Sequence, residues 1–587
     1  MFEKIITSVP VKLIFLIALG TVIYKLFKAC KKTNQLGLFA AFSATVVISI
    51  TLSATAIGKI YPYGLFTDIA YTTLLYTFMA WFAPKLNHTH MRSGILVLLL
   101  TIASLPPLFY ALHIMIVGSS VNADSFIAIF QTNANEGLEY IASFLTAFNV
   151  GLILITLAIL FYIAITHARA ETESTNKYLV LASLFLNIAL LILPPPEKGL
   201  INFPFITYQT YSHELKAVQE KTSKLNVEGK NFTATKSETG ETYIVIIGES
   251  LNKHHMSLYG YEKETTPLLD KLNKNGELVV IQQAFANYPG TMAALSMAMS
   301  QSNQQNNVEY ADAVGIVELF NNAGFTTVWI GNQPLSNSYD MVLGYIANKV
   351  TRKTLTFDTQ FHAMSHKDQK PDGVLLPYIK NELERSESNN KIIFVHLMGN
   401  HTNYCERYPQ EFEKFTMSIY ENIMTRLFKG GIGHSVECYD NSVYYNDYVV
   451  SEAISLLANH SNAYKKPAAL LYFSDHSEDI SRGVGHSSSN FSFEMLEIPT
   501  LFWTSKTYNA TYPEKINTLK ANSTALFSND FIFDTAIGLT NTSTDNKTYC
   551  PECDLTSINY SLPKERAFTM HGKMLYTTTR NPFYKNQ

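Results

Sequence analysis

A carboxylate and an imidazole stand side by side after an apolar run in the C-terminal half of the chain. The run Leu470–Phe473 is typical of a strand, and Asp475 and His476 follow it closely. Aspartate offers a hard oxygen and histidine a borderline nitrogen, a pair of ligands that zinc or manganese accepts. His486 comes later, after a loop that contains Gly485 and can return it to the same place. Asp and His are also ordinary turn and cap residues, so this interpretation needs support from elsewhere.

Polar side chains follow two further buried-strand candidates. Glu249 comes just after the β-branched run Tyr243–Ile247, and His396 and His401 lie at the end of the run Ile392–Leu397. In open α/β sheets, ligands collect at the carboxyl ends of the strands. We therefore expect these side chains at the same sheet edge as the Asp–His pair.

A threonine is the candidate nucleophile. Thr291 follows Tyr288, Pro289 and Gly290 and precedes the helix-like segment Met292–Met299, so the Pro-Gly turn places it at the start of a helix. There the hydroxyl meets the positive end of the helix dipole and N–H groups that can receive a phosphoryl oxygen. A bound Zn²⁺ would stabilise the alkoxide of such a threonine. The alternative is an ordinary N-cap threonine.

Strand-like runs alternate with helical patterns through the whole C-terminal half. This alternation predicts an α/β/α sandwich with a mostly parallel sheet. The expected strands lie at 243–247, 326–330, 392–397 and 468–473, and the expected helices near 266–275, 313–323, 374–385 and 442–458.

The N-terminal part has the pattern of a polytopic helical membrane domain. Charged residues are 16% of the chain but sparse before Pro196, and the net charge of −3 offers no basic face for nucleic acid. Each apolar run is near the roughly 20 residues that cross a bilayer. Six such runs exceed what a soluble core would hold; they lie at about 9–28, 37–58, 65–84, 94–117, 142–166 and 178–195.

Basic residues mark alternate loops of this domain. The loops near 25–32, 85–92 and 169–177 carry them, whereas the loops near 59–64 and 118–141 carry only Lys59. By the positive-inside rule the first set is cytoplasmic, and everything after about Pro196 lies outside. The run at 9–28 leaves two arrangements open, with six spans or with five. We expect a transmembrane domain at 1–196, a connector with an interfacial segment at 197–240, and an outer domain at 241–587.

The cysteines agree with an oxidising compartment for the outer domain. Four of the five cysteines fall there, which suggests two disulfides. Proximity favours Cys405 with Cys438 and Cys550 with Cys553, although the sequence alone leaves the connectivity open. A metal site at Cys550 and Cys553 is the competing interpretation.

Taken together, these motifs resemble those of the phosphoethanolamine transferases of Gram-negative envelopes, in the alkaline phosphatase and sulfatase superfamily. The resemblance covers nearly the whole chain. It rests on Gly248-Glu-Ser250, His255-Met-Ser-Leu-Tyr-Gly-Tyr261, Thr265-Thr-Pro267, Gly290-Thr291, Trp329-Ile-Gly-Asn-Gln333, His396-Leu-Met-Gly-Asn-His401, Tyr439-Asp-Asn441 with Asp447, and Ser474-Asp-His-Ser-Glu478.

The resemblance implies a role for each site residue. It implies a zinc ion held by Glu249, Thr291, Asp475 and His476, with Thr291 as the nucleophile that becomes phosphoethanolamine-modified. His401 and His486 would contact the transferred phosphate, protonate a leaving group or hold a second zinc. Thr132 and Glu136, one helical turn apart in the outer loop, would contact the ethanolamine head group, although this segment also fits a simple exposed helix.

The resemblance also implies substrates and location. The donor would be phosphatidylethanolamine, and the acceptor lipopolysaccharide (core sugar, Kdo or lipid A) or another envelope glycan. The protein would be a multi-pass inner-membrane enzyme with a periplasmic catalytic domain. Adding a cationic amine would reduce attraction for peptides such as polymyxin.

The wording of the motifs at 255–261 and 131–133 resembles the branch that acts on lipopolysaccharide core sugars or other glycans, and the chain departs from the lipid A-modifying members at two points. No cysteine lies between Cys30 and Cys405, and Pro334 follows the Asn-Gln pair where those members carry a downstream lysine. The alternatives are a glycerol-phosphate transferase of the lipoteichoic acid synthase type and a non-catalytic envelope binding module. A sulfatase activity would need a Cys/Ser-x-Pro-x-Arg sequence, which the chain lacks.

Overall fold

The computed structural model describes most of both halves of the chain. The described residues are 9–56, 62–117, 147–170, 172–192, 208–209, 212, 232–306, 308, 312–333, 341–356, 370–418, 435–481, 485–486, 491–545, 547–569 and 573–574. They divide into two compact units, one within residues 1–217 and one within residues 218–587.

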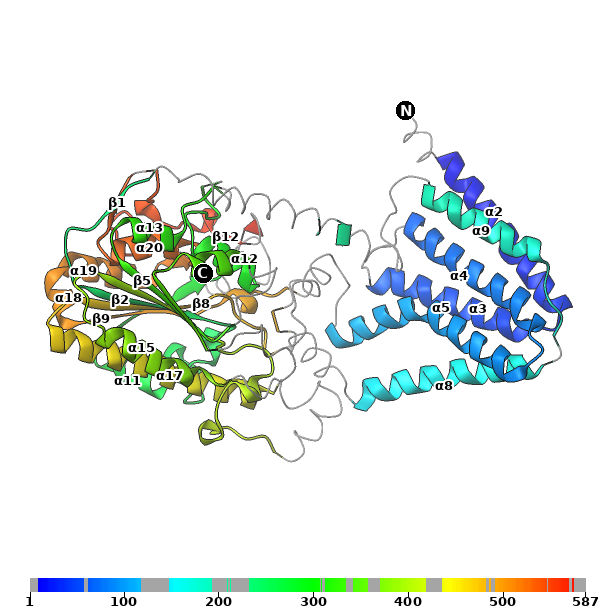
Figure 1. The fold of residues 1–587 in the computed structure, drawn as a ribbon, viewed down its shortest axis with the longest axis horizontal. Helices are drawn as coiled ribbons and strands as arrows, with labels where there is room; N and C mark the ends of the chain where they lie inside the picture. The colour runs from blue at the N-terminus through cyan, green and yellow to red at the C-terminus, as the bar shows by residue number, and fades with distance from the viewer. Residues whose placement is uncertain are drawn as a thin grey trace. The chain divides into compact units, whose positions relative to one another are not determined.

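The first unit consists of long apolar helices, drawn in blue and cyan in Figure 1. Two of them, at Thr89–Ala111 and Val150–Arg169, are long and apolar enough by composition to cross a membrane. The described helices match the six predicted apolar runs: α2 (Val9–Lys32), α3 (Leu36–Ala56), α4 (Pro62–Phe82), α5 (Thr89–Val117), α8 (Ala147–Arg169) and α9 (Lys177–Ile192).

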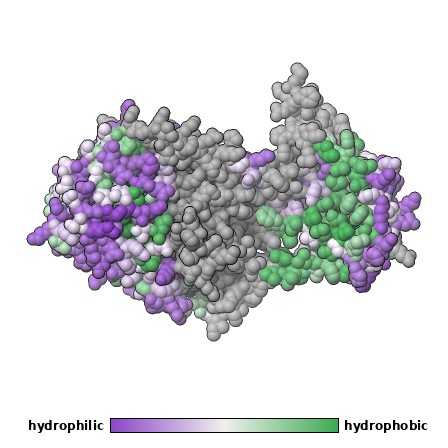
Figure 2. Space-filling model, in the orientation of Figure 1, coloured by the Kyte–Doolittle hydropathy of each residue, from purple (hydrophilic) through white to green (hydrophobic). Residues whose placement is uncertain are grey.

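This unit exposes apolar side chains outward, as a lipid-facing surface requires. Leu154 is 60% exposed and Phe185 is 74% exposed, and Figure 2 shows the green apolar surface over these helices. The C-terminal part of the first helix packs with the others, since Leu19 belongs to a cluster with Ala70 and Leu186 while Leu26 belongs to the larger helical core. That this first helix crosses the membrane stays a prediction.

The three basic loops meet at one end of the bundle. The Gln35 side chain and the Thr175 backbone N–H both donate to the Ala80 carbonyl, at 3.0 and 3.2 Å. The Arg92 guanidinium donates to the Ala168 carbonyl at 3.2 Å. Because α9 starts at this end and runs away from it, α9 ends at the opposite end of the bundle.

The second unit is built on a seven-stranded sheet in the order β3-β9-β8-β2-β7-β5-β6. The four predicted strands form its parallel centre: β2 (Thr242–Gly248), β5 (Thr326–Gly331), β7 (Lys391–His396) and β8 (Ala468–Ser474). The register pairs Gly248 with Ser474, so the ends of β2 and β8 coincide.

Helices cover both faces of this sheet (Figure 1). Alternate residues of β2 point to opposite faces, as strand geometry requires. Ile244 and Ile246 pack under α11 (Pro267–Lys274), α15 (Leu376–Glu384) and α17 (Val436–Tyr464). Tyr243, Val245 and Ile247 pack under the helices of the other face: α12 (Thr291–Ala298), α13 (Ile316–Asn322), α14 (Met341–Asn348), α18 (Lys506–Thr511), α19 (Pro513–Ala521) and α20 (Ile532–Leu539). The predicted α/β/α sandwich is confirmed.

The sheet extends beyond the predicted strands at both edges. One edge is antiparallel, with β9 (Thr500–Thr504) between β8 and β3 (Leu278–Ile281), and the other edge ends in the parallel strand β6 (Arg352–Leu355). These strands are short, and short runs carry little periodicity. Small two-stranded pairings complete the unit: β1 (Ala234–Thr235) with β11 (Ser543–Thr544), β4 (Gln283–Phe285) with β10 (Leu526–Ser528), and β12 (Phe568–Thr569) with β13 (Lys573–Met574).

Two disulfides cross-link the second unit. Cys405 pairs with Cys438, and Cys550 pairs with Cys553. The first joins the loop after β7 to the start of α17. The alternative prediction of a metal site at Cys550 and Cys553 is therefore wrong.

The central strand should control the stability of this unit. Ile246 is fully buried between the sheet and α17, so we expect Ile246→Ala to lower the free energy of unfolding by about 2–5 kcal/mol. Ile558 is 90% exposed, and Ile558→Ala should change the free energy of unfolding by less than about 0.5 kcal/mol. Urea denaturation of both variants checks this, and equal effects would contradict it.

Candidate active site

Two carboxylates and an imidazole converge at the carboxyl end of the sheet. Glu249 follows β2, while Asp475 and His476 follow β8, and all three are buried. One potential ligand atom from each lies within 4.8 Å of the others. His476 Nε2 is 3.3 Å from Glu249 Oε1 and 3.4 Å from Asp475 Oδ2. The register of β2 against β8 brings together residues that are far apart in sequence.

The backbone beside Glu249 is strained. Ser250 has φ of 58°, a left-handed conformation that costs a non-glycine residue about 1–3 kcal/mol. Its N–H donates to Asp475 Oδ1 at 3.1 Å and its hydroxyl to Glu249 Oε1 at 2.9 Å. The Tyr439 hydroxyl donates to the Ser250 carbonyl at 2.7 Å. These bonds hold the two carboxylates in a fixed relation.

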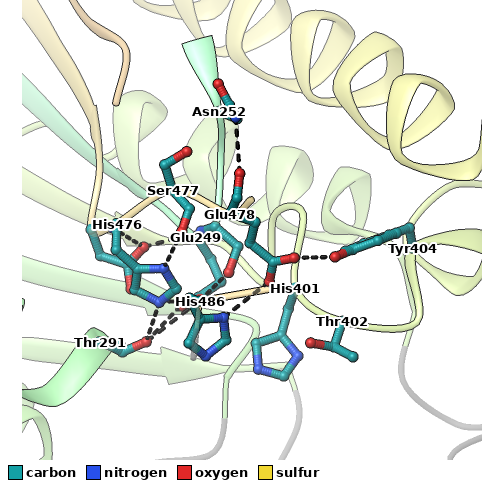
Figure 3. Close-up of polar contacts among 12 residues, drawn as sticks. Glu249, Asn252, Thr291, His401, Thr402, Tyr404, His476, Ser477, Glu478 and His486 are labelled. Carbon is teal, nitrogen blue, oxygen red and sulfur yellow. Dashed lines mark hydrogen bonds and ion pairs between the residues drawn. The ribbon is translucent and has the colours of Figure 1, made fainter. Parts of the chain in front are cut away.

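Thr291 is the first residue of α12, with its hydroxyl in the same site. The N-cap is the extended residue Gly290, so the N-cap interpretation of Thr291 is wrong. The Thr291 hydroxyl lies 3.3 Å from Glu249 Oε2 and 3.2 Å from His476 Nε2 (Figure 3). The first N–H groups of a helix have no acceptor within it, so they are suited to an anionic oxygen.

The donor set fits a divalent cation. Asp475 Oδ2 is buried and accepts no hydrogen bond from any residue that the structure describes. Burial and the neighbouring Glu249 carboxylate raise the pKa of Asp475 well above its usual range. Although burial lowers it, Asp475 and Glu249 raise the pKa of His476 to about 10. The cluster thus attracts positive charge, and a zinc ion held by two carboxylate oxygens, an imidazole and a threonine oxygen would provide it.

Two supports of this cluster come from strand-end loops whose motifs the sequence analysis quoted without assigning these residues a role. Gln333, after β5, donates to Glu249 Oε2 at 3.2 Å and to the Leu397 carbonyl at 2.7 Å. Gly399 has φ of +55°, and a Cβ there would lie 2.7 Å from the Glu249 carbonyl oxygen. The position of Gln333 at the end of a strand was the available signal.

His401 and His486 border the cluster. The ring centroid of His486 lies 4.4 Å from that of His476 and 6.4 Å from that of His401. Burial lowers the pKa of His401 to about 4, so this imidazole is neutral at neutral pH. A neutral imidazole is suited to accept a proton.

Glu478 is a site residue whose role the sequence did not indicate. Its fully buried carboxylate accepts from His486 Nδ1 at 3.0 Å and from the Tyr404 hydroxyl (Figure 3). Although burial raises it, the hydrogen bond from His486 helps to hold the pKa of Glu478 below its usual range. The acid is therefore a carboxylate at neutral pH.

His396 does not join the site, although we expected it at this edge. It belongs to β7, is fully buried and packs edge-on against Trp329 with ring centroids 5.7 Å apart. Neither of its ring nitrogens has a hydrogen-bond partner within the described part of the chain. Thr132 and Glu136 lie outside the described residues.

Comparison with known proteins agrees with this geometry. Residues 241–542 match the family model described as Sulfatase. The chain belongs to the sulfatase family. Family membership here describes the fold and not a sulfatase activity, because the chain lacks the Cys/Ser-x-Pro-x-Arg sequence that a sulfatase nucleophile needs.

The chain is also similar to named transferases. It is 28% identical over 446 residues to phosphoethanolamine transferase EptC of Escherichia coli O18:K1:H7, covering 70% of this chain and 74% of that protein. The crystal structure of the C-terminal periplasmic domain of Escherichia coli EptC in complex with Zn is 26% identical, with a TM-score of 0.50 over 59% of this chain and 93% of that one.

The likeness extends to the helical unit. The integral membrane protein EptA from Neisseria meningitidis, a lipooligosaccharide phosphoethanolamine transferase, aligns over 91% of this chain and 98% of its own with a TM-score of 0.56. At 18% identity this likeness shows the fold alone. A helical membrane domain followed by a sulfatase-like α/β domain is thus the architecture.

The buried His396 should make stability sensitive to acid. Burial lowers its pKa to about 4, below the unfolded value of about 6.5, so the unfolded chain binds more protons between these pH values. Stability is therefore lost as pH falls through this window. We expect His396→Phe to reduce the loss between pH 7 and pH 4 by about 3 kcal/mol, as measured by denaturation at each pH. Parallel pH curves for the two proteins would contradict this.

Proposed function

We propose that this chain is a zinc-dependent transferase that moves phosphoethanolamine from phosphatidylethanolamine to lipopolysaccharide or another envelope glycan. The observation that carries the proposal is the Thr291 hydroxyl, which lies against Glu249 and His476 at the start of a helix. Similarity to proteins named phosphoethanolamine transferases supports the transferred group.

In the first half-reaction, Thr291 attacks the phosphorus of the lipid as an alkoxide, its hydroxyl proton having been released to solvent. The bond from Thr291 Oγ1 to phosphorus forms while the bond from phosphorus to the diacylglycerol oxygen breaks. The leaving oxygen takes a proton from His486, whose ring carries protons on both nitrogens at this step. His401, which is neutral at neutral pH, would contact the transferred phosphate. The product is a threonine ester of phosphoethanolamine.

In the second half-reaction, an acceptor hydroxyl or phosphate attacks the same phosphorus. The acceptor oxygen forms the new bond, the bond to Thr291 Oγ1 breaks, and the acceptor proton passes to the histidine that lost one earlier. The N–H groups at the start of α12 would stabilise the phosphoryl oxygens in both steps. A zinc ion bound by Glu249, Asp475, His476 and Thr291 would supply positive charge that lowers the pKa of the threonine hydroxyl. A second zinc held by His401 and His486 is the alternative to proton transfer by these histidines.

The donor head group carries an ammonium, for which a carboxylate is a suitable partner. Glu136, with Thr132, is the candidate for this contact. The acceptor that we propose is a core sugar or another envelope glycan, because the chain departs from the pattern of the lipid A-modifying members in the segment after Gln333.

We assign the protein to the bacterial inner membrane, with the catalytic unit in the periplasm. The basic loops meet at one end of the bundle, which the positive-inside rule places in the cytoplasm. The last bundle helix, α9, runs away from that end. Two disulfides in the catalytic unit fit an oxidising compartment.

The proposal is tested by the intact mass of the full chain purified from its membrane. We expect a fraction of the wild type to carry an adduct of about 123 Da, the mass of a phosphoethanolamine ester. Thr291→Ala should carry none, because it lacks the attacking oxygen, whereas the matched variant Thr291→Ser should keep it.

Other masses would change the assignment. An adduct of about 154 Da, the mass of glycerol phosphate, would move the protein to the lipoteichoic acid type of transferase. An adduct that persists in Thr291→Ala would contradict the nucleophile, and a wild type without adduct or zinc would favour a binding module.

A further inference from the structure

His486 is held by a chain of buried hydrogen bonds that the reaction as described does not use. Its Nδ1 lies 3.0 Å from Glu478 Oε1, and the other carboxylate oxygen of Glu478 accepts from the Tyr404 hydroxyl. Both oxygens of Glu478 are thus occupied by side chains. Glu478 therefore leaves neither carboxylate oxygen free to bind a metal ion, whereas Asp475 Oδ2 has no hydrogen-bond partner among the described residues.

We propose that Glu478 and Tyr404 are positioning residues that set the tautomer and orientation of His486 for proton transfer. This inference rests on the proposed function. A carboxylate accepts only, so Nδ1 must be the protonated nitrogen, which leaves Nε2 as the nitrogen that exchanges a proton with the reacting oxygens. The carboxylate also stabilises the positive charge of the ring when both nitrogens carry protons.

The carboxylate is itself fixed from two sides. The Asn252 side-chain amide donates to the backbone carbonyl of Glu478 at 2.9 Å. The Tyr404 ring is buried edge-on against Tyr439, with centroids 4.9 Å apart. A side chain with this little freedom holds its partner in one orientation.

A covalent bond connects the segments that carry these two tyrosines. The disulfide joins Cys405, next to Tyr404, to Cys438, next to Tyr439. Tyr404 supports His486 through Glu478, and Tyr439 donates to the carbonyl of Ser250, the strained residue after Glu249. The cross-link therefore braces the histidine and the carboxylate cluster from the same pair of rings.

The test compares two donors that differ in their leaving group. Diacylglycerol is a poor leaving group and needs a proton, whereas 4-nitrophenolate from the 4-nitrophenyl ester of phosphoethanolamine leaves without one. The rate of adduct formation at Thr291 is measured with the full chain in detergent for the wild type, Glu478→Gln, Tyr404→Phe and His486→Gln.

Loss of proton donation should affect only the lipid donor. We expect Glu478→Gln and His486→Gln to slow transfer from phosphatidylethanolamine by about 100-fold and from the nitrophenyl ester by less than about 3-fold. Tyr404→Phe should show the same selectivity with a loss of about 10-fold, because one oxygen of Glu478 is then released.

Tyr408→Phe is the matched control. Tyr408 is a buried tyrosine near the same disulfide, with its hydroxyl 3.4 Å from Cys438 Sγ and no contact to Glu478 recorded among the described residues. We expect it to keep wild-type rates with both donors.

The outcomes separate this inference from the proposed function. Equal losses with both donors in Glu478→Gln and Tyr404→Phe would mean a merely structural role, and unchanged rates would mean no role, so either overturns the positioning. A wild type that takes phosphoethanolamine from neither donor would instead overturn the proposed function.

Discussion

The burial of two carboxylates beside one imidazole is the constraint on which this structure depends. Moving an unpaired charge out of water is costly, so such a cluster persists only with compensating charge or hydrogen bonds. Hydrogen bonds from Ser250 and Gln333 satisfy part of the demand, but one oxygen of Asp475 receives none within the described residues. A cation at that point completes the set, and it also places positive charge beside the hydroxyl of Thr291.

Much of the surrounding fold serves to hold this arrangement. The parallel centre of the sheet brings the ends of β2 and β8 together, and the N-terminus of α12 adds the threonine. The left-handed Ser250 stores strain that hydrogen bonds to Asp475 and from Tyr439 offset. Around the cluster, His486 and His401 are held at its border, where substrate oxygens would exchange protons. Rigid support of this kind is what positions reacting groups within fractions of an ångström.

The main elements of this site were predictable from sequence because each signal is local. Strand-like runs followed by Glu249 and by Asp475 and His476 identified the edge of the sheet, and the Pro-Gly turn identified the start of a helix at Thr291.

The residues that support this site were not predictable in the same way. Glu478 ends the Ser-Asp-His-Ser-Glu motif, but only the fold shows that Tyr404 and His486 share its oxygens. The prediction that His396 belongs to the site was wrong, because the alternation of side chains along the strand directs His396 toward Trp329. The antiparallel edge was missed because its strands are too short to show a period.

The central claim is that Glu249, Asp475, His476 and Thr291 surround one zinc ion. Anomalous X-ray scattering from crystals of the full chain, recorded on both sides of the zinc absorption edge, tests it directly. We predict an anomalous peak within about 2.0–2.2 Å of one oxygen or nitrogen from each of these side chains. A zinc-replete crystal whose peak lies elsewhere, with this cluster protonated or closed on itself, would contradict the account.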